Sequence, residues 1–218
     1  MTADRPRGVR EDASTLEAVL AVVFDFDGTL VDTMPLHYEA YRRAIAECAG
    51  AELEPEVFWA EIGGTAREVV PRLLARVGCE ADPSVVHARK KDLLRDVLTD
   101  ADIPVLETAK LLPVLRGRLP MALASSGSRQ GIELMLDRLG WTAYFDAVVT
   151  GEDVAAGKPA PDAFELAARR LGVDPARCLA FEDTPAGLAS ARRAGMAVFD
   201  VGLVATPRPD RQDRDLTP

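Results

Sequence analysis

The sequence predicts an α/β fold in which helices cover a parallel β-sheet, with a small helical domain inserted near its start. Short apolar runs recur along the chain and helical patterns separate them, which is typical of βαβ units and a parallel sheet. These runs lie near residues 18–24, 121–125, 145–150, 178–183 and 196–201. Residues 54–99 instead carry helical patterns and no convincing strand, which predicts the helical insertion.

The composition is that of an ordinary globular protein. The chain has 218 residues, of which 48% are hydrophobic, and a net charge of -9 that argues against nucleic-acid or anionic-membrane binding. No apolar run approaches the roughly 20 residues of a membrane span. Cys48, Cys79 and Cys178 are far apart and form no Cys-x-x-Cys, so we expect reduced thiols in a cytoplasmic monomer.

The expected division of the chain follows from these patterns. Polar tails are expected at residues 1–17 and 206–218, a sheet-containing core at 18–33 and 101–205, and the helical cap at 34–100. Residues 33–35 are expected to form a hinge before the first cap helix, which carries an apolar stripe over residues 38–48. Within the core, helices are predicted near residues 108–116, 131–140, 163–171 and 187–194.

Two carboxylates, Asp25 and Asp27, follow the first apolar run directly, and Gly28 then breaks the strand. In an extended chain, residues i and i+2 point to the same side, so both carboxylates can face one site. Two like charges so close repel unless a cation lies between them, and Mg²⁺ prefers such oxygen ligands. A solvated acidic turn after a strand is the alternative explanation.

Polar residues recur where other predicted strands end. Ser125 and Ser126 follow the second run, Glu182 and Asp183 end the fourth, and Lys158 precedes a helix. The carboxyl ends of parallel strands meet at one edge of a sheet, where ligands bind in open α/β folds. Each group alone has a simpler explanation, as a helix cap, a solvated loop lysine or a helix start, but together they predict a site.

The set suits phosphoryl transfer, in which catalysis consists of positioning and charge stabilisation. Asp25 would attack phosphorus to give an aspartyl-phosphate, and Asp27 would serve as acid and base. The remaining predicted roles are a phosphate clamp from Ser125, Ser126, Gly127 and Lys158, close backbone approach at Gly28, a hydroxyl from Thr29, and a metal site completed by Glu182 and Asp183.

The motifs Asp-Phe-Asp-Gly-Thr-Leu, Ala-Ser-Ser-Gly, Gly-Lys-Pro-Ala-Pro-Asp and Phe-Glu-Asp-Thr-Pro-Ala-Gly resemble those of the haloacid dehalogenase (HAD) superfamily, and its β-phosphoglucomutase-like branch in particular. The resemblance covers residues 20–202 and implies a Rossmann-like core with a helical cap. It implies Asp25 as nucleophile, Asp27 as acid/base, and a Mg²⁺ site of Asp25, the Asp27 carbonyl, Glu182 and Asp183. Dehalogenases and phosphonatases of this superfamily typically lack an acid at position 27, so Asp27 favours phosphate esters.

The resemblance extends to the cap. Arg67 resembles the arginine that binds the distal phosphate in phosphoglucomutases, and Lys90 resembles a second cap contact with the substrate. Thr33 and His37 match hinge positions that couple cap closure to the acid/base. Arg67 and Lys90 can equally be surface residues, and His37 a packed core histidine. Arg129 stands where mutases often carry a shorter polar residue.

The sequence thus predicts a Mg²⁺-dependent phosphatase of small phosphorylated metabolites, with sugar phosphates as the expected class. β-Phosphoglucomutase, in which a sugar hydroxyl replaces water as the acceptor, is the alternative enzyme. A phosphorylation-switched receiver module would need neither the cap nor Asp27. A catalytically idle binding fold is disfavoured by the complete motif set.

Overall fold

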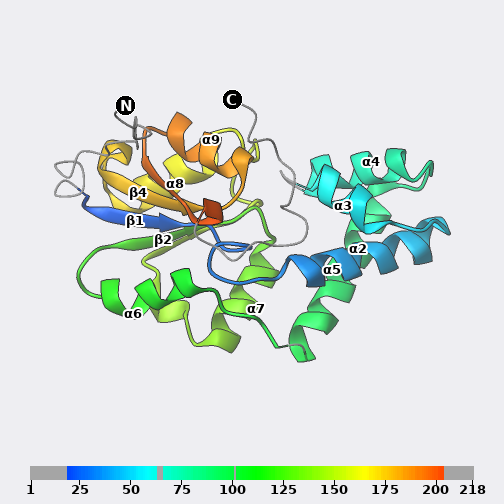
Figure 1. The fold of residues 1–218 in the computed structure, drawn as a ribbon, viewed down its shortest axis with the longest axis horizontal. Coiled ribbons are helices and arrows are strands. Elements are labelled where there is room, and N and C mark those ends of the chain that lie inside the picture. The colour runs from blue at the N-terminus through cyan, green and yellow to red at the C-terminus, as the bar shows by residue number, and fades with distance from the viewer. Residues whose placement is uncertain (1–18, 63–65, 101, 204–218) are drawn as a thin grey trace, which may run out of the picture.

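The computed structural model describes residues 19–62, 66–100 and 102–203, so the two predicted tails lie outside the described residues. Its centre is a five-stranded parallel sheet in the order β3-β2-β1-β4-β5 (Figure 1). The strands are β1 (Ala21–Phe24), β2 (Met121–Ala124), β3 (Ala147–Val149), β4 (Cys178–Glu182) and β5 (Ala197–Asp200). The predicted α/β fold with a parallel sheet is therefore confirmed.

The central strand β1 is buried on both faces. Val22 and Phe24 belong to one apolar cluster, whereas Ala21 and Val23 belong to another, because successive side chains of a strand point to opposite faces. Strands that are covered on both sides read as continuous apolar runs, which is why the sequence pattern identified them.

Helices cover both faces of the sheet (Figure 1). One layer contains α8 (Asp162–Leu171) and α9 (Pro185–Arg193), and the other contains α6 (Leu111–Leu115) and α7 (Arg129–Leu139). The α8 layer packs against small side chains such as Ala122 and Ala124, so this helix lies close to the sheet. Single 3₁₀ turns occupy Glu107–Lys110, Thr142–Tyr144, Pro175–Arg177 and Val201–Leu203.

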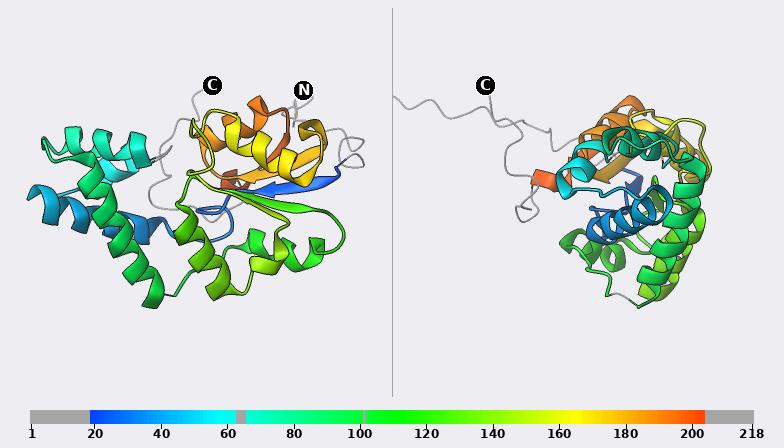
Figure 2. Two further views of the ribbon diagram at one scale, coloured as in Figure 1. Left: turned by 180° about the vertical axis from the view of Figure 1, so that it is seen from behind. Right: turned by 90° about the vertical axis from the view of Figure 1, so that its right-hand side faces the viewer.

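The insertion after β1 is helical, as predicted. Its helices are α2 (Met34–Ala49), α3 (Pro55–Glu61), α4 (Ala66–Arg76) and α5 (Pro83–Asp100). Figures 1 and 2 show them beyond the end of the sheet toward which the β1 arrow points. They share one continuous apolar cluster with the α7 face of the sheet, so the cap and the core pack together.

The segment that joins β1 to the cap is more ordered than the sequence pattern suggests. Val31 forms β-bridges with Asp27 and with Val105. The segment that leads into the cap and the segment that leads out of it therefore lie side by side. Thr33 precedes α2 as its N-terminal flanking residue, and Pro35 lies inside the first helical turn. Met34 and Pro35, expected in the hinge, are therefore the first two residues of α2, and hinge motion at this place stays a prediction.

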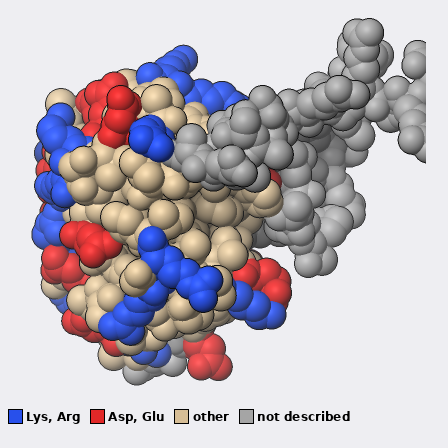
Figure 3. Space-filling model, turned by 90° about the vertical axis from the view of Figure 1, so that its left-hand side faces the viewer, with Lys and Arg blue, Asp and Glu red and all other residues tan. Residues whose placement is uncertain are grey.

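The molecular surface carries charges of both signs. On the side remote from the cap helices, Lys and Arg residues are interspersed with Asp and Glu residues and separated by uncharged ones (Figure 3). Among the described helices, none combines the length and the apolar character needed to cross a membrane.

Phe58 is expected to contribute much of the stability of the cap. Its side chain is fully buried, and its ring lies 5.4 Å from that of Tyr38, 5.9 Å from Tyr41 and 5.0 Å from Trp59. Phe58→Ala should lower the free energy of unfolding by about 3–5 kcal/mol in urea denaturation, because it leaves a cavity among these rings. Val85→Ala, at an exposed position of α5, should change it by less than about 0.5 kcal/mol. Equal effects of the two substitutions would contradict this account.

Candidate active site

The site is centred on a buried ammonium group between two carboxylates. Lys158 Nζ lies 2.5 Å from Asp25 Oδ1 and 3.0 Å from Glu182 Oε1. These residues come from the ends of β1 and β4 and from the loop before α8, and each is less than a tenth exposed. The Lys158 ammonium also lies 5.0 Å above the ring of Phe164. The structure thus joins three of the predicted residues in one ion-pair network.

The charges in this network shift each other's titration. Burial alone would lower the pKa of Lys158, but Asp25 and Glu182 outweigh burial and raise that pKa above its usual range. Burial raises the pKa of Asp25, an effect that Lys158 counters and that the neighbouring Glu182 and Asp183 carboxylates reinforce. A single lysine therefore does not neutralise the acidic groups gathered here.

Asp25, Glu182 and Asp183 could hold a metal ion. Each offers a carboxylate oxygen, and these oxygens lie within 4.8 Å of one another. An all-oxygen donor set with excess negative charge suits a hard divalent cation. The donor set therefore fits the predicted metal site. The backbone carbonyl of Asp27, the fourth predicted ligand, stays a prediction, and the side chain of Asp27 contacts Thr33 and His37 instead.

Glu182 is held by the residues that begin α9. The backbone N–H and the hydroxyl of Thr184 donate to Glu182 Oε2 at 2.6 and 3.0 Å. The same hydroxyl accepts from the N–H of Gly187 at 3.0 Å and so caps the helix. A Cβ atom on Gly187 would lie 1.9 Å from Glu182 Oε1, so this position has no room for a side chain. Helix capping and carboxylate placement thus depend on the same turn.

Gly28 and Thr29 contact the acidic cluster rather than the cavity. Gly28 has φ of 90°, and a Cβ atom there would lie 2.4 Å from Asp183 Oδ2. The hydroxyl of Thr29 is buried and donates to Asp183 Oδ1 at 3.3 Å. Both residues thus lie against the Asp183 carboxylate, and neither lines the cavity described below. Their assignment as substrate contacts stays a prediction.

The loop after β2 presents its backbone to the site. Ser125 is buried, and its Oγ accepts from the N–H of Gly127 at 2.9 Å, while Ser126 and Gly127 line the cavity. Ser128 caps α7 by accepting from the N–H of Gly131 at 3.3 Å. Successive backbone groups at the start of a helix suit an anion, as the sequence predicts.

This loop is supported by a polar network that the sequence analysis did not identify. Asp153 Oδ2 accepts from the N–H and the hydroxyl of Thr150, at 2.8 and 2.9 Å, and from Arg129 Nη2 at 2.6 Å. Its other oxygen accepts from Arg170 at 3.0 Å. Burial would raise the pKa of Asp153, but these donors outweigh burial and hold the pKa below its usual range. The side chain of Arg129 is thereby turned toward Asp153.

Gly151 completes the support of the same loop. Its N–H donates to the carbonyl of Gly127 at 3.0 Å, and a Cβ atom there would lie 2.6 Å from the carbonyl oxygen of Ser126. The turn after β3 therefore packs directly on the backbone of two residues that line the cavity, Ser126 and Gly127.

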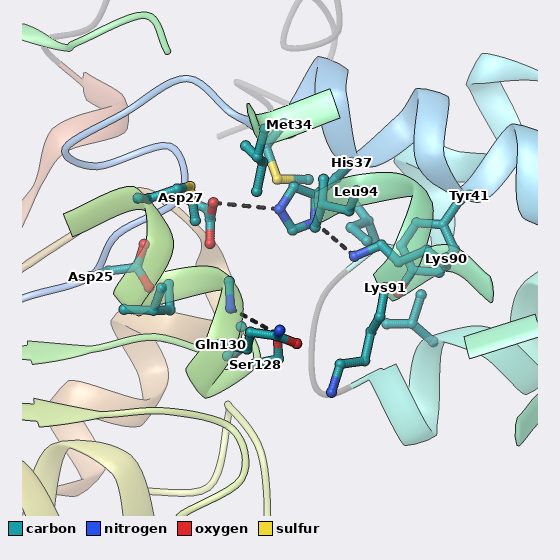
Figure 4. A pocket seen from close by; sticks show the side chains of 18 of the residues that line it. Asp25, Asp27, Met34, His37, Tyr41, Lys90, Lys91, Leu94, Ser128 and Gln130 are labelled. Atoms are coloured by element: carbon teal, nitrogen blue, oxygen red, sulfur yellow. Dashed lines mark hydrogen bonds and ion pairs between the residues drawn. The ribbon is translucent and has the colours of Figure 1, made fainter. Parts of the chain in front are cut away.

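A polar chain connects Asp27 with the cap (Figure 4). Asp27 Oδ1 accepts a hydrogen bond from the Thr33 hydroxyl and lies 3.6 Å from His37 Nε2. His37 Nδ1 lies 3.3 Å from the ammonium of Lys90, which also lies 4.6 Å above the ring of Tyr41. Burial, aided by Lys90, lowers the pKa of His37 to about 4. A neutral imidazole can therefore accept from Lys90 and present its other N–H toward Asp27.

A cavity of about 180 Å³ lies between the two acids and the cap (Figure 4). The core supplies polar groups and the apolar side chains of Ile132, Leu134 and Met135, and the cap supplies both apolar side chains and cations. Lining residues include Asp25, Asp27, Lys158, Glu182, Ser126 and Gly127 from the core and Met34, His37, Tyr41, Val69, His87, Lys90, Lys91 and Leu94 from the cap. Arg67, predicted as a cap contact, is exposed on α4 and does not line this cavity. The nearby residues 63–65 lie outside the described ranges.

Comparisons with known proteins agree with this geometry. A family model described as haloacid dehalogenase-like hydrolase matches residues 19–195. The fructose-1-phosphate phosphatase YqaB of Escherichia coli is 34% identical over 188 residues, which cover 86% of this chain and 99% of that protein. The β-phosphoglucomutase of Bacillus subtilis is 31% identical, with 90% of this chain and 91% of that protein covered.

A solved structure has a similar fold. The crystal structure of CbbY from Rhodobacter sphaeroides in complex with phosphate matches with a TM-score of 0.77 and 27% identity, covering 83% of this chain and 84% of that one. Both the family model and the relatives extend over most of the chain. The resemblance found in the sequence motifs is therefore confirmed, and this protein belongs to the haloacid dehalogenase-like hydrolases.

Proposed function

We propose that this hydrolase is a Mg²⁺-dependent phosphatase of small phosphorylated metabolites, with sugar monophosphates as its substrate class. The observation that carries the proposal is the buried Asp25 carboxylate, which lines the cavity, accepts a hydrogen bond from Lys158 and lies beside Glu182 and Asp183. A relative named as a fructose-1-phosphate phosphatase supports the substrate class.

In the proposed mechanism, Asp25 attacks the phosphorus atom and the ester oxygen departs. Lys158 and the backbone N–H groups of Ser126 and Gly127 would bind the phosphoryl oxygens, whose negative charge they complement. A cation held by Asp25, Glu182 and Asp183 would neutralise further phosphoryl charge. Water then attacks the aspartyl-phosphate, which releases inorganic phosphate and restores Asp25.

Asp27 is the proposed acid and base for the two steps. It would give a proton to the departing ester oxygen and later take one from the attacking water. Its contacts with Thr33 and His37 fix the carboxyl group, and Lys90 links this group to helix α5 of the cap. The arrangement makes the acid/base dependent on the position of the cap, which also excludes bulk water from the cavity.

The alternative function is phosphoglucomutase activity, which the relative from Bacillus subtilis supports. A mutase must bind a second phosphate while the first one reacts. The arginine predicted for that role, Arg67, is exposed and does not line the cavity, and Arg129 is paired with Asp153 and Glu133. The position of Arg67 outside the cavity favours the phosphatase, and the cations that do line the cap side of the cavity are Lys90 and Lys91.

The proposal also covers the domain boundaries, the cellular compartment, the oligomeric state and the partners of the protein. We assign residues 34–100 to the cap and residues 18–33 and 101–205 to the core. We also propose a cytoplasmic monomer without nucleic-acid or membrane partners. The three free cysteines are consistent with a reducing compartment.

Product analysis tests the reaction and the nucleophile together. By ³¹P NMR, wild-type protein with Mg²⁺ and hexose monophosphates should release inorganic phosphate, and Asp25→Asn should abolish this release because the amide is a poor nucleophile. Asp92→Asn, at an exposed position of α5, should retain full activity. A second sugar phosphate formed without inorganic phosphate would indicate a mutase, and turnover by Asp25→Asn near the wild-type rate would exclude Asp25 as nucleophile.

Removal of the metal should stop turnover reversibly. EDTA should abolish phosphate release, and added Mg²⁺ should restore it. Because the ion binds only the folded acidic cluster, Mg²⁺ should also raise the Tm of wild-type protein, whereas Glu182→Gln should lose most of this shift. Turnover that resists chelation, or an equal Tm shift in Glu182→Gln, would contradict the assigned metal ligands.

Lys90 is expected to cost stability while it supports activity. Burial, opposed by Asp27, lowers its pKa from 10.5 to about 8. Below about pH 8 the lysine is charged in both states, so its burial penalty is fully present, and the penalty is relieved between about pH 8 and 10.5. Lys90→Met should therefore raise the Tm at pH 7, with a smaller gain at pH 10, and lower kcat about tenfold through loss of the contact with His37.

Lys91→Met provides the matched stability control for Lys90, because its side chain is 35% exposed. It should change the Tm at pH 7 much less than Lys90→Met does. A Tm loss in Lys90→Met, or a gain that does not depend on pH, would contradict the assigned burial penalty.

A further inference from the structure

Lys158 belongs to a segment without regular secondary structure, so its position depends on contacts from other elements. Residues 150–161, between β3 and α8, form neither helix nor strand. A lysine carries its ammonium group on a long flexible stem, so the group stays at one place only where its backbone and its partners are fixed. The contacts that fix this backbone therefore bear on the site.

Two side chains of α9 donate to the backbone directly after Lys158. Arg193 Nη1 donates to the carbonyl of Pro159 at 2.7 Å, and Ser190 Oγ donates to the carbonyl of Ala160 at 2.5 Å. Ser190 is fully buried, whereas Arg193 is exposed. Water therefore cannot reach the Ser190 hydroxyl to replace its contact with the loop, but it can compete for the contact of Arg193.

The same helix also holds the carboxylate with which Lys158 pairs. The first turn of α9 fixes Glu182 and leaves room for this carboxylate at Gly187. Gly187, Ser190 and Arg193 are spaced three residues apart, so they are neighbours on the helix surface. Helix α9 thus contacts both members of the Lys158–Glu182 pair, the carboxylate at its start and the lysine loop nearer its end.

We infer that Ser190 and Arg193 are positioning residues that hold the loop so that the Lys158 ammonium reaches Asp25 and the phosphoryl group. The inference rests on the proposed phosphatase function and adds to it two residues that do not line the cavity. Their effect on the reaction is therefore transmitted through the loop. An ammonium that moves away stabilises the phosphoryl charge less, which lowers kcat/KM.

Kinetics of single variants test the effect on the reaction. With Mg²⁺ and the best member of a hexose and pentose monophosphate panel, Ser190→Ala should lower kcat/KM about tenfold, the effect of one lost hydrogen bond. Arg193→Ala should lower it about threefold, because this contact is exposed, and Arg193→Lys, which keeps a donor, should recover most of the loss. Arg192→Ala is the matched control at the exposed neighbouring position of α9, and should change kcat/KM less than about twofold.

The reactivity of the lysines gives a readout that does not depend on turnover. The chain has four lysines, of which Lys158 and Lys90 are buried and Lys110 is exposed. We expect an amine-acetylating N-hydroxysuccinimide ester, with peptide mass spectrometry, to label Lys158 at least about threefold faster in Ser190→Ala than in wild-type protein, because the loop then opens more often. The labelling rates of Lys90, in the cap, and of Lys110, on the surface, should stay unchanged.

Unchanged kcat/KM in Ser190→Ala, or unchanged labelling of Lys158, would overturn the inference. Equally faster labelling of Lys90 would also overturn it, because it would indicate general loosening of the fold. A loss in Arg193→Ala no larger than that in Arg192→Ala would remove the role of Arg193. Wild-type protein that releases no phosphate, while Lys158 is still labelled faster in Ser190→Ala, would instead refute the phosphatase function and leave the positioning of Lys158 intact.

Discussion

The buried ion pair between Lys158 and the carboxylates of Asp25 and Glu182 is the constraint on which the site depends. Removing charges from water is costly, and the cost is offset only when geometry and further hydrogen bonds are favourable. The structure meets this condition by bringing the three groups from separate elements within 2.5–3.0 Å and by adding the Thr184 donors to Glu182. Because Asp183 adds negative charge that one lysine does not balance, the same arrangement that holds Asp25 also favours a cation.

The parallel sheet explains why such a network can form at all. Residues that are far apart in the chain end their strands at one edge, and the cap helices lie beyond that edge (Figure 2). In the proposed function, the core supplies the groups for phosphate chemistry, and the cap supplies the groups that surround the rest of the substrate. The Asp27–His37–Lys90 chain joins these two parts, so two cap residues position the proposed acid/base of the core.

The sequence was sufficient to predict the fold and the acidic centre, because both follow from local patterns. Buried strands are continuous apolar runs, and Asp25, Ser125 and Glu182 stand directly after or at the ends of such runs. Side-chain direction could not be predicted in the same way. Thr29 points to Asp183 because Gly28 leaves space for that carboxylate, and the Asp153 network joins segments with no common motif. The helical pattern of α5 likewise does not say which of its polar residues face a cavity.

Two glycines near α9 restrict which substitutions this part of the chain tolerates. Gly187 lies in the first turn of α9 and Gly195 lies in the turn after it, and the two positions are restricted for different reasons. Gly195 has φ of 87° with no neighbouring atom within 4 Å of its Cβ position, so Asn, which tolerates the left-handed region, could replace it. A Cβ atom at position 187 would lie 1.9 Å from the Glu182 carboxylate, so any side chain there would displace a candidate metal ligand. Among variants of α9 and the turn after it, the left-handed backbone conformation would limit which residues are tolerated at position 195. At position 187, any side chain would instead disturb the candidate active site.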